Sequence, residues 1–198
     1  MKNKIVIASG NPGKLREIRR ILDPLGFNVV PQSDFAVPEC PEPHVTFIEN
    51  CLAKARHASL HTGLPALADD SGICVDALNG APGVYSARYA GEPRSDQRNN
   101  EKLISALDNE ANRRAHYYCV IVLVRHPDDP QPLIAEGSWH GEIIDTPRGE
   151  NGFGYDPYFF LPEFGKTGAE LDPDHKNAIS HRGQALDILV NKLRGLAG

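Results

Sequence analysis

The stretch LADDSGICVDAL, residues 67–78, places two adjacent carboxylates, Asp69 and Asp70, between two apolar runs. Adjacent carboxylates repel each other, and burying either one costs free energy unless it is paired or bound to a cation. We expect one strand at 65–69 and another at 73–78, with a Ser-Gly turn between them. Because side chains alternate along a strand, the two carboxylates should point to opposite faces of a sheet.

This pair of carboxylates allows two interpretations. One of the two can lie in a cleft, where a carboxylate holds Mg²⁺ or accepts a proton from water, while the other stabilises the turn by accepting backbone N–H groups. Alternatively, Asp-Asp-Ser-Gly is an ordinary turn composition without a chemical role. The local pattern does not separate the two interpretations.

Strand-like and helix-like segments alternate in the first half of the chain, and a strand hairpin follows in the second half. Short β-branched runs bounded by Gly and Pro predict strands, and apolar residues at helical spacing predict helices. This order favours an α/β fold with a mixed sheet and helices on its faces. Besides the strands at the carboxylate pair, we expect strands at 4–9, 27–31, 115–126, 132–144 and 156–162, and helices at 13–26, 45–63, 95–108 and 176–196.

Length and composition limit the classes of protein that the chain can represent. The 198 residues suit one domain or two closely joined lobes, so we predict a single domain over 1–198. A net charge of −5 without a basic tail argues against nucleic acid as a partner, although local cations and a divalent metal would still allow a polyphosphate ligand. No apolar run is long enough to span a membrane, and four irregularly spaced cysteines predict free thiols in a reducing cytoplasm.

The segment SGNPGK, Ser9–Lys14, lies between a predicted strand and a predicted helix. Backbone N–H groups at such a junction favour an anion, and Lys14 adds a positive charge. The segment is not a P-loop, because Leu15 follows the lysine where a metal-binding hydroxyl would be needed. The alternative is a tight turn that only begins a helix.

Two later segments supply further candidate contacts. In GFGYDP, 152–157, the glycines permit a close backbone approach and the aromatic rings can stack on a planar base, although a glycine-rich loop leading into a strand has the same composition. In HKNAISHRG, 175–183, cations stand near the start of a helix, against its dipole, which is consistent with an anionic or carbonyl ligand, although solvated ends of an amphipathic helix are the commoner case. Together with the turn and the carboxylates, these are the parts of a nucleotide site.

With these segments in place, the chain resembles the inosine/xanthosine triphosphate pyrophosphatase family, in particular its bacterial branch. Each motif is modest alone, but the set follows the family's order and spacing over nearly the whole chain. The matching segments are 9–14, 46–55, 67–78, 80–89, 152–157 and 176–186.

The resemblance implies an elongated α/β fold with two lobes about a long mixed sheet, a central substrate cleft and a homodimeric assembly. It also implies Mg²⁺-dependent hydrolysis of ITP, dITP and XTP between the α and β phosphates, which yields a monophosphate and pyrophosphate. Two rivals remain open: a phosphatase that releases orthophosphate, and a regulator that binds a nucleotide without turnover.

Residue by residue, the resemblance assigns Asp70 as the general base and a metal ligand, which leaves Asp69 to hold the predicted Ser-Gly turn. Glu42 is the expected second metal ligand, with Glu39 or Glu49 as alternatives, because the sequence around Glu42 departs from the family pattern. The expected substrate contacts are Ser9, Gly10, Asn11, Pro12, Gly13, Lys14, Lys54, Ser71, Phe153, Gly154, Tyr155, Asp156, Lys176, His181 and Arg182.

Overall fold

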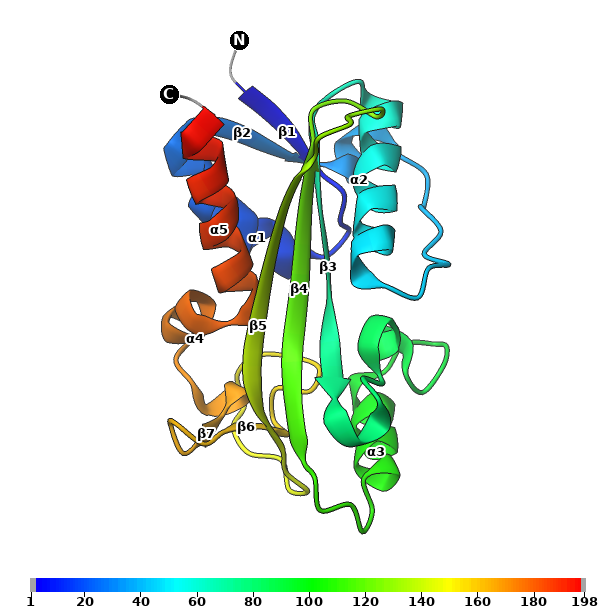
Figure 1. Ribbon diagram of the computed structural model, residues 1–198, viewed down its shortest axis with the longest axis vertical. Helices are drawn as coiled ribbons and strands as arrows, with labels where there is room; N and C mark the ends of the chain where they lie inside the picture. Colours follow the sequence, from blue (N-terminus) through cyan, green and yellow to red (C-terminus); the bar gives the residue numbers. More distant parts are fainter. Residues whose placement is uncertain (1–2, 197–198) are drawn as a thin grey trace. The chain divides into compact units, whose positions relative to one another are not determined.

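A computed structural model of the chain describes residues 3–196 and contains one open sheet of seven strands in the order β2-β1-β3-β4-β5-β6-β7 (Figure 1). The strands are β1 (Asn3–Ile7), β2 (Phe27–Pro31), β3 (Ala66–Val75), β4 (Arg114–Val124), β5 (Leu133–Ile143), β6 (Phe159–Leu161) and β7 (Lys166–Thr167). The helices are α1 (Pro12–Leu22), α2 (Phe47–Thr62), α3 (Asp96–Ala106), α4 (Pro173–Ile179) and α5 (His181–Leu196).

The sheet is mixed, as predicted. Strand β1 pairs in parallel with β2 and β3, whereas β6 is antiparallel to β5 and β7. Strand β4 lies at the centre of the order, as its run of β-branched residues predicted. The amide of Ile143, at the end of β5, donates to the carbonyl of Arg113, just before β4, so these two strands form the expected antiparallel hairpin.

The chain divides into two compact units. Unit 1 comprises Met1–Asp70, Cys119–Glu136 and Gln184–Gly198, and unit 2 comprises Ser71–Tyr118 and Gly137–Gly183. Strands β3, β4 and β5 therefore each contribute residues to both units.

Unit 1 has its own hydrophobic core on one face of its strands. Helices α1 and α5 supply Ile18, Leu22, Leu186 and Leu189, which pack against strand residues such as Ile121. Helix α2 covers the opposite face (Figure 1). It begins at the cap residue Thr46 and ends at Gly63 in the left-handed region, as the sequence predicted.

A second core fills unit 2. Leu103 and Leu107, from α3 and its C-terminal end, pack with aromatic side chains from β4, β5 and β6. Ser95, the first residue of the predicted helix 95–108, caps α3, because its hydroxyl accepts the amide of Arg98 at 3.3 Å.

The predicted Ser-Gly turn inside 67–78 is wrong. Residues Ala66–Val75 form one continuous strand, β3, and a short 3-10 helix at Asp76–Leu78 follows it. Asp, Ser and Gly have low intrinsic strand propensity, but pairing within the sheet and burial on both faces override that preference. Asp69 therefore holds no turn. The predicted alternation is retained, because both carboxylates now lie within one strand.

The predicted helix 176–196 is also interrupted. It is divided into α4 and α5 at Ser180, whose backbone is extended and whose hydroxyl accepts the amide of Gly183 at 3.3 Å. Gly183 permits this sharp junction, since a Cβ at this position would lie 2.0 Å from the carbonyl oxygen of Asn177. The predicted cations thus belong to two helices, with Lys176 in α4 and both His181 and Arg182 at the start of α5.

Candidate active site

The turn Ser9–Lys14 connects β1 to α1 in unit 1. Asn11 caps the helix, and its Oδ1 accepts the amides of Gly13 at 2.8 Å and Lys14 at 3.3 Å. The hydroxyl of Ser9 accepts the Asn11 amide at 3.1 Å. The turn therefore begins helix α1. The amides of Gly13 and Lys14, which were expected to face an anion, instead donate to the side chain of Asn11.

Lys14 extends from the first turn of α1 to Asp69 on β3. The two side chains form an ion pair, and the carboxylate of Asp69 is 1% exposed. The thiol of Cys119 donates to the other carboxylate oxygen, Oδ2, at 3.5 Å. Asp69 is therefore part of a buried polar network that holds the side chain of Lys14, and this contact replaces the predicted role in a Ser-Gly turn.

Asp70 faces α2, the helix on the opposite side of unit 1. Lys54 of α2 donates from Nζ to Asp70 Oδ1 at 2.8 Å, and the same nitrogen lies 3.3 Å from Glu42 Oε1. One lysine therefore joins two carboxylates. The partners of Asp69 and Asp70 come from α1 and α2, as strand alternation requires.

Burial and charge act on this cluster in opposite directions. Burial raises the pKa of Asp70 above its ordinary value, and the positive charge of Lys54 offsets part of that effect. For Lys54, burial alone would lower the pKa, but Asp70 and then Glu42 raise it above its ordinary value. The lysine therefore stays charged, while the Asp70 carboxyl binds a proton more readily than an exposed aspartate.

The structure distinguishes between the three acids considered as partners of Asp70. Glu42 shares Lys54 with Asp70. Glu49 accepts the hydroxyl of Thr46 at 2.5 Å in the cap of α2, and Glu39 is exposed. The geometry therefore favours Glu42.

The remaining predicted contacts form a second cluster in unit 2. Arg182 donates from Nη2 to the hydroxyl of Ser71 at 3.0 Å. The ring of His181 stacks on Tyr117, with centroids 4.8 Å apart and an interplanar angle of 10°. Ser71 directly follows Asp70 in β3, so one peptide bond connects the two clusters.

Asp156 organises the loop 152–156. Its carboxylate is buried, accepts the amide of Phe153 at 2.8 Å and pairs with Lys176 at 2.5 Å. Gly152 has φ +77°, and a Cβ there would lie 2.2 Å from Asp156 Oδ2, so this position requires glycine. Asp156 therefore positions the cationic side chain of Lys176.

The two aromatic residues of this loop differ in accessibility. Phe153 is 55% exposed, and Lys176 Nζ lies 5.4 Å from the centroid of its ring. Tyr155 is 4% exposed and donates its hydroxyl to the carbonyl of Ser86 at 2.8 Å. Phe153 can therefore stack on a ligand, whereas the ring of Tyr155 belongs to the core.

Two residues of α3 that the sequence analysis missed hold the same loop. Asp96 accepts the amide of Gly154 at 2.9 Å, and Asn100 donates to the carbonyl of Gly154 at 2.9 Å. No local sequence motif predicts these two residues, because each contact joins segments more than fifty residues apart. Their effect is to fix the backbone beside Phe153.

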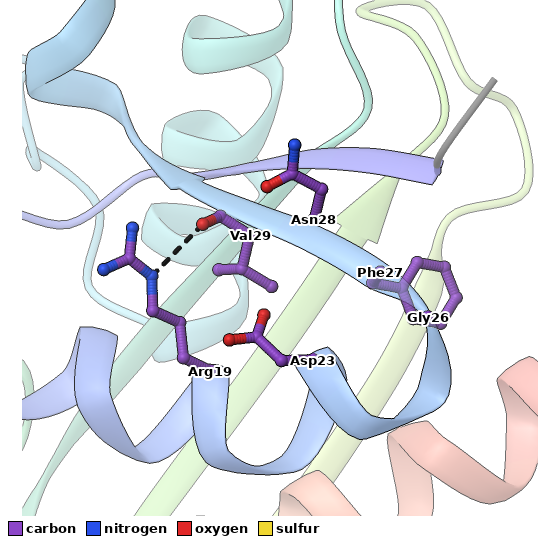
Figure 2. Close-up of a pocket in the computed structure, with 6 residues that line it drawn as sticks. All are labelled: Arg19, Asp23, Gly26, Phe27, Asn28 and Val29. Carbon is purple, nitrogen blue, oxygen red and sulfur yellow. Dashed lines mark hydrogen bonds between the residues drawn. The ribbon is translucent and has the colours of Figure 1, made fainter.

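A cavity of about 450 Å³ lies elsewhere in unit 1, along the C-terminal part of α1 and β2 (Figure 2). Its lining is Arg19, Asp23, Gly26, Phe27, Asn28 and Val29, none of which is a predicted site residue. Arg19 donates from Nε to the carbonyl of Val29 at 3.1 Å, so its guanidinium is bound to the edge strand.

Fold and clusters together describe an α/β protein with carboxylates and lysines in one unit and an accessible aromatic ring beside cations in the other. The first cluster suits a phosphate group, and the second suits an aromatic base. The chain belongs to the Ham1 family, whose sequence model matches residues 5–192.

Individual relatives agree with this family assignment. The chain is 69% identical to a dITP/XTP pyrophosphatase of Nitrosomonas europaea, over 96% of this chain and 94% of the relative. It is 64% identical to a dITP/XTP pyrophosphatase of Chromobacterium violaceum over the full length of both. Among solved structures, a HAM1 protein from Coxiella burnetii superposes with a TM-score of 0.94 at 51% identity, covering 97% of this chain and 98% of that one.

Proposed function

We propose that this protein hydrolyses the non-standard purine nucleoside triphosphates dITP, ITP and XTP to the corresponding monophosphate and pyrophosphate. Relatives that are 64% and 69% identical over nearly their whole length bear the name dITP/XTP pyrophosphatase, which supports this proposal. The reaction would remove deaminated purines from the nucleotide pool.

The observation that carries the proposal is the arrangement of Asp70, Lys54 and Glu42. A buried carboxylate with a raised pKa is a better proton acceptor than an exposed aspartate, provided that it is ionised at the working pH. The adjacent lysine keeps it partly ionised and can also attract a phosphate.

The residues present fit Mg²⁺. Within residues 3–196, no three His, Cys, Asp or Glu side chains form a ready metal cage. Mg²⁺ in phosphate enzymes usually takes only one or two carboxylates, together with water and substrate oxygens, and Asp70 and Glu42 are such a pair. When bound, the ion supplies positive charge that offsets the repulsion between phosphate and an attacking oxygen.

In the proposed mechanism, Asp70 accepts a proton from the water that attacks phosphorus. Lys54 and Lys14 stabilise the negative charge of the departing pyrophosphate, with help from the hydroxyl of Ser9. Positioning and electrostatic stabilisation should account for most of the rate, as in phosphoryl transfer generally.

We propose that the cluster of unit 2 selects the base. Phe153 stacks on the purine, and Lys176 lies over the ring of Phe153. Hypoxanthine and xanthine carry a carbonyl at C6 where adenine carries an amine, so a fixed donor from His181, Arg182 or a nearby backbone amide would favour them. Arg182 is held by Ser71, which limits its freedom to adapt to an amine.

The test is product-resolved hydrolysis of ITP, XTP, GTP and ATP, each with and without Mg²⁺. We expect pyrophosphate from ITP and XTP, dependence on Mg²⁺ and much slower turnover of ATP. Release of orthophosphate would instead identify a phosphatase, and binding of ITP without turnover would identify a regulator. Equal rates on all four nucleotides would contradict a role in removing damaged purines.

We further propose a homodimer that acts in the cytoplasm. The dimer rests on the resemblance to the family, and light scattering at two protein concentrations tests it. For the described part of the chain, no helix has both the length and the apolar character needed to cross a bilayer.

A further inference from the structure

Tyr117 on β4 is a buried aromatic residue between two groups of the candidate base site. It is 8% exposed, and one side of its ring stacks nearly parallel on His181. Phe159 meets the ring edge-on, with centroids 4.8 Å apart at 68°, and Trp139 lies 6.3 Å away at 22°. The edge-on contact with Phe159 thus fixes the plane of Tyr117, and Tyr117 in turn fixes the plane of His181.

The hydroxyl of Tyr117 lies within the electrostatic influence of the Asp156 carboxylate. That carboxylate binds Lys176 and the amide of Phe153. Burial, and then the negative charge of Asp156, raise the pKa of Tyr117 well above its ordinary value, so the phenol stays protonated at neutral pH. Tyr117 therefore stacks on His181 and is also influenced by the charge of Asp156.

We propose that Tyr117 is a positioning residue for recognition of the purine base. Its ring sets the orientation of the His181 imidazole, and its hydroxyl orients Asp156 and, through Asp156, Lys176. Tyr117 acts through these neighbours because it lies in the core. The inference rests on the proposed function, since it assigns a role within the same base site.

Two substitutions separate the ring from the hydroxyl. Tyr117→Phe keeps the stacking surface and removes only the hydroxyl that is proposed to orient Asp156, so we expect a several-fold higher KM for ITP with kcat and the preference for ITP over ATP retained. Tyr117→Leu removes the stacking surface, so the ratio of kcat/KM for ITP to that for ATP should fall about tenfold or more, the scale expected for a misplaced contact group. Trp139→Phe is the control, because Trp139 packs in the same core but the stacking partner of His181 is Tyr117.

A readout independent of turnover is the NMR signal of the His181 imidazole in the ligand-free protein. The ring current of Tyr117 should shift this signal, and the shift should be lost in Tyr117→Leu and kept in both other variants. A folded Tyr117→Leu protein with normal selectivity and a normal His181 signal would overturn the proposal. If Tyr117→Leu does not fold, the test rests on Tyr117→Phe. An unchanged KM for ITP in Tyr117→Phe then overturns the role of the hydroxyl.

Failure of the proposed function is distinguishable from failure of this inference. If the wild-type protein releases no pyrophosphate from ITP, the proposed reaction is wrong, and calorimetric titration with IMP then tests the base site alone. Weaker IMP binding by Tyr117→Leu than by the wild type and Trp139→Phe supports positioning. Equal binding by all three, or no binding by the wild type, overturns it.

Discussion

Asp70 combines two properties at the scale of a single residue. It is 9% exposed, so burial raises its pKa, yet Lys54 lies 2.8 Å away and keeps the carboxylate form accessible. An exposed aspartate would be a weaker base, and a buried one without a cation would remain protonated. Lys54 therefore determines over which pH range Asp70 can accept a proton.

Replacing Asp70 with Asn should remove the proton acceptor while preserving the size of the side chain. We expect kcat for ITP to fall by about 10²–10⁴-fold, the range typical of general bases. Asp145→Asn is the control, because Asp145 is an exposed carboxylate in an ion pair with Arg113. Stopped assays of pyrophosphate release measure the effect, and a folded Asp70→Asn protein with near-normal turnover would remove Asp70 from the mechanism.

The pH dependence of kcat/KM should report the Asp70 carboxyl. Because its pKa is raised, activity should be lost as the pH falls through a value above that of an ordinary aspartate. Lys54→Met removes the charge that lowers this pKa. The acidic limb of the profile, over which kcat/KM falls as the pH falls, should therefore move to higher pH, in addition to any loss of rate. Lys192→Met, a change at an exposed lysine, should leave the limb in place. A limb that does not move in Lys54→Met would contradict the coupling.

At the scale of elements, strand β3 is tied to α1 through one face and to α2 through the other. The ties are the ion pair of Asp69 with Lys14 and that of Asp70 with Lys54. Adjacent residues of one strand can serve two helices because alternate side chains leave the sheet in opposite directions. The carboxylate pair thus connects strand β3 to Lys14 on α1 and to Lys54 on α2.

Asp69→Asn should chiefly affect stability and binding. It leaves Lys14 without its charged partner at a buried site, which should cost about 1–3 kcal/mol of unfolding free energy. KM for ITP should rise, because the side chain of Lys14 is no longer held by Asp69. The fall in kcat should be smaller than in Asp70→Asn. The matched control is Glu92→Gln, which removes an exposed ion pair and should change stability by no more than about 0.5 kcal/mol. Urea denaturation and steady-state kinetics measure the two effects.

The junction of α4 and α5 provides a test within unit 2. Gly183→Ala places a methyl group against the carbonyl of Asn177, so the two helices must separate, at a cost of about 1–3 kcal/mol. KM for ITP should also rise, since Lys176 and Arg182 lie on the two sides of this junction. Gly195→Ala, in the same helix α5, meets no atom within 4 Å and should stabilise the protein by up to about 1 kcal/mol. Similar melting temperatures for both variants would contradict the close approach.

At the scale of the whole molecule, the chain has two cores, one in each compact unit. Three strands contribute residues to both units, so loss of one core should disrupt the strands on which the other depends. We therefore expect the units to unfold together.

Core substitutions in either unit test this expectation. Leu189→Ala in unit 1 and Leu103→Ala in unit 2 each remove a fully buried side chain, and each should cost about 2–5 kcal/mol. Trp139, the single tryptophan, reports on unit 2 by fluorescence, while circular dichroism reports on all helices and strands. Both signals should shift together in both variants. A Leu189→Ala protein whose fluorescence transition is unchanged would show that the units unfold separately.

Local sequence patterns were sufficient to predict much of the fold. The strand at Phe27–Pro31, the helix between Thr46 and Gly63, and the Ser95 cap could be predicted because propensity, capping and packing agree there. The central position of β4 followed from its β-branched composition. The sequence alone also identified the segments of the candidate site, because the motifs stand in a specific order along the chain.

Only the tertiary structure decided how those segments are used. Pairing with neighbouring strands made 66–75 one strand in spite of its turn-like centre, and close packing at Gly183 divided the last helix. The partners of Asp69 and Asp70, and the stacking of Tyr117 on His181, join residues far apart in the chain. Short-range patterns carry no information on such contacts, because they depend on which elements become neighbours after folding.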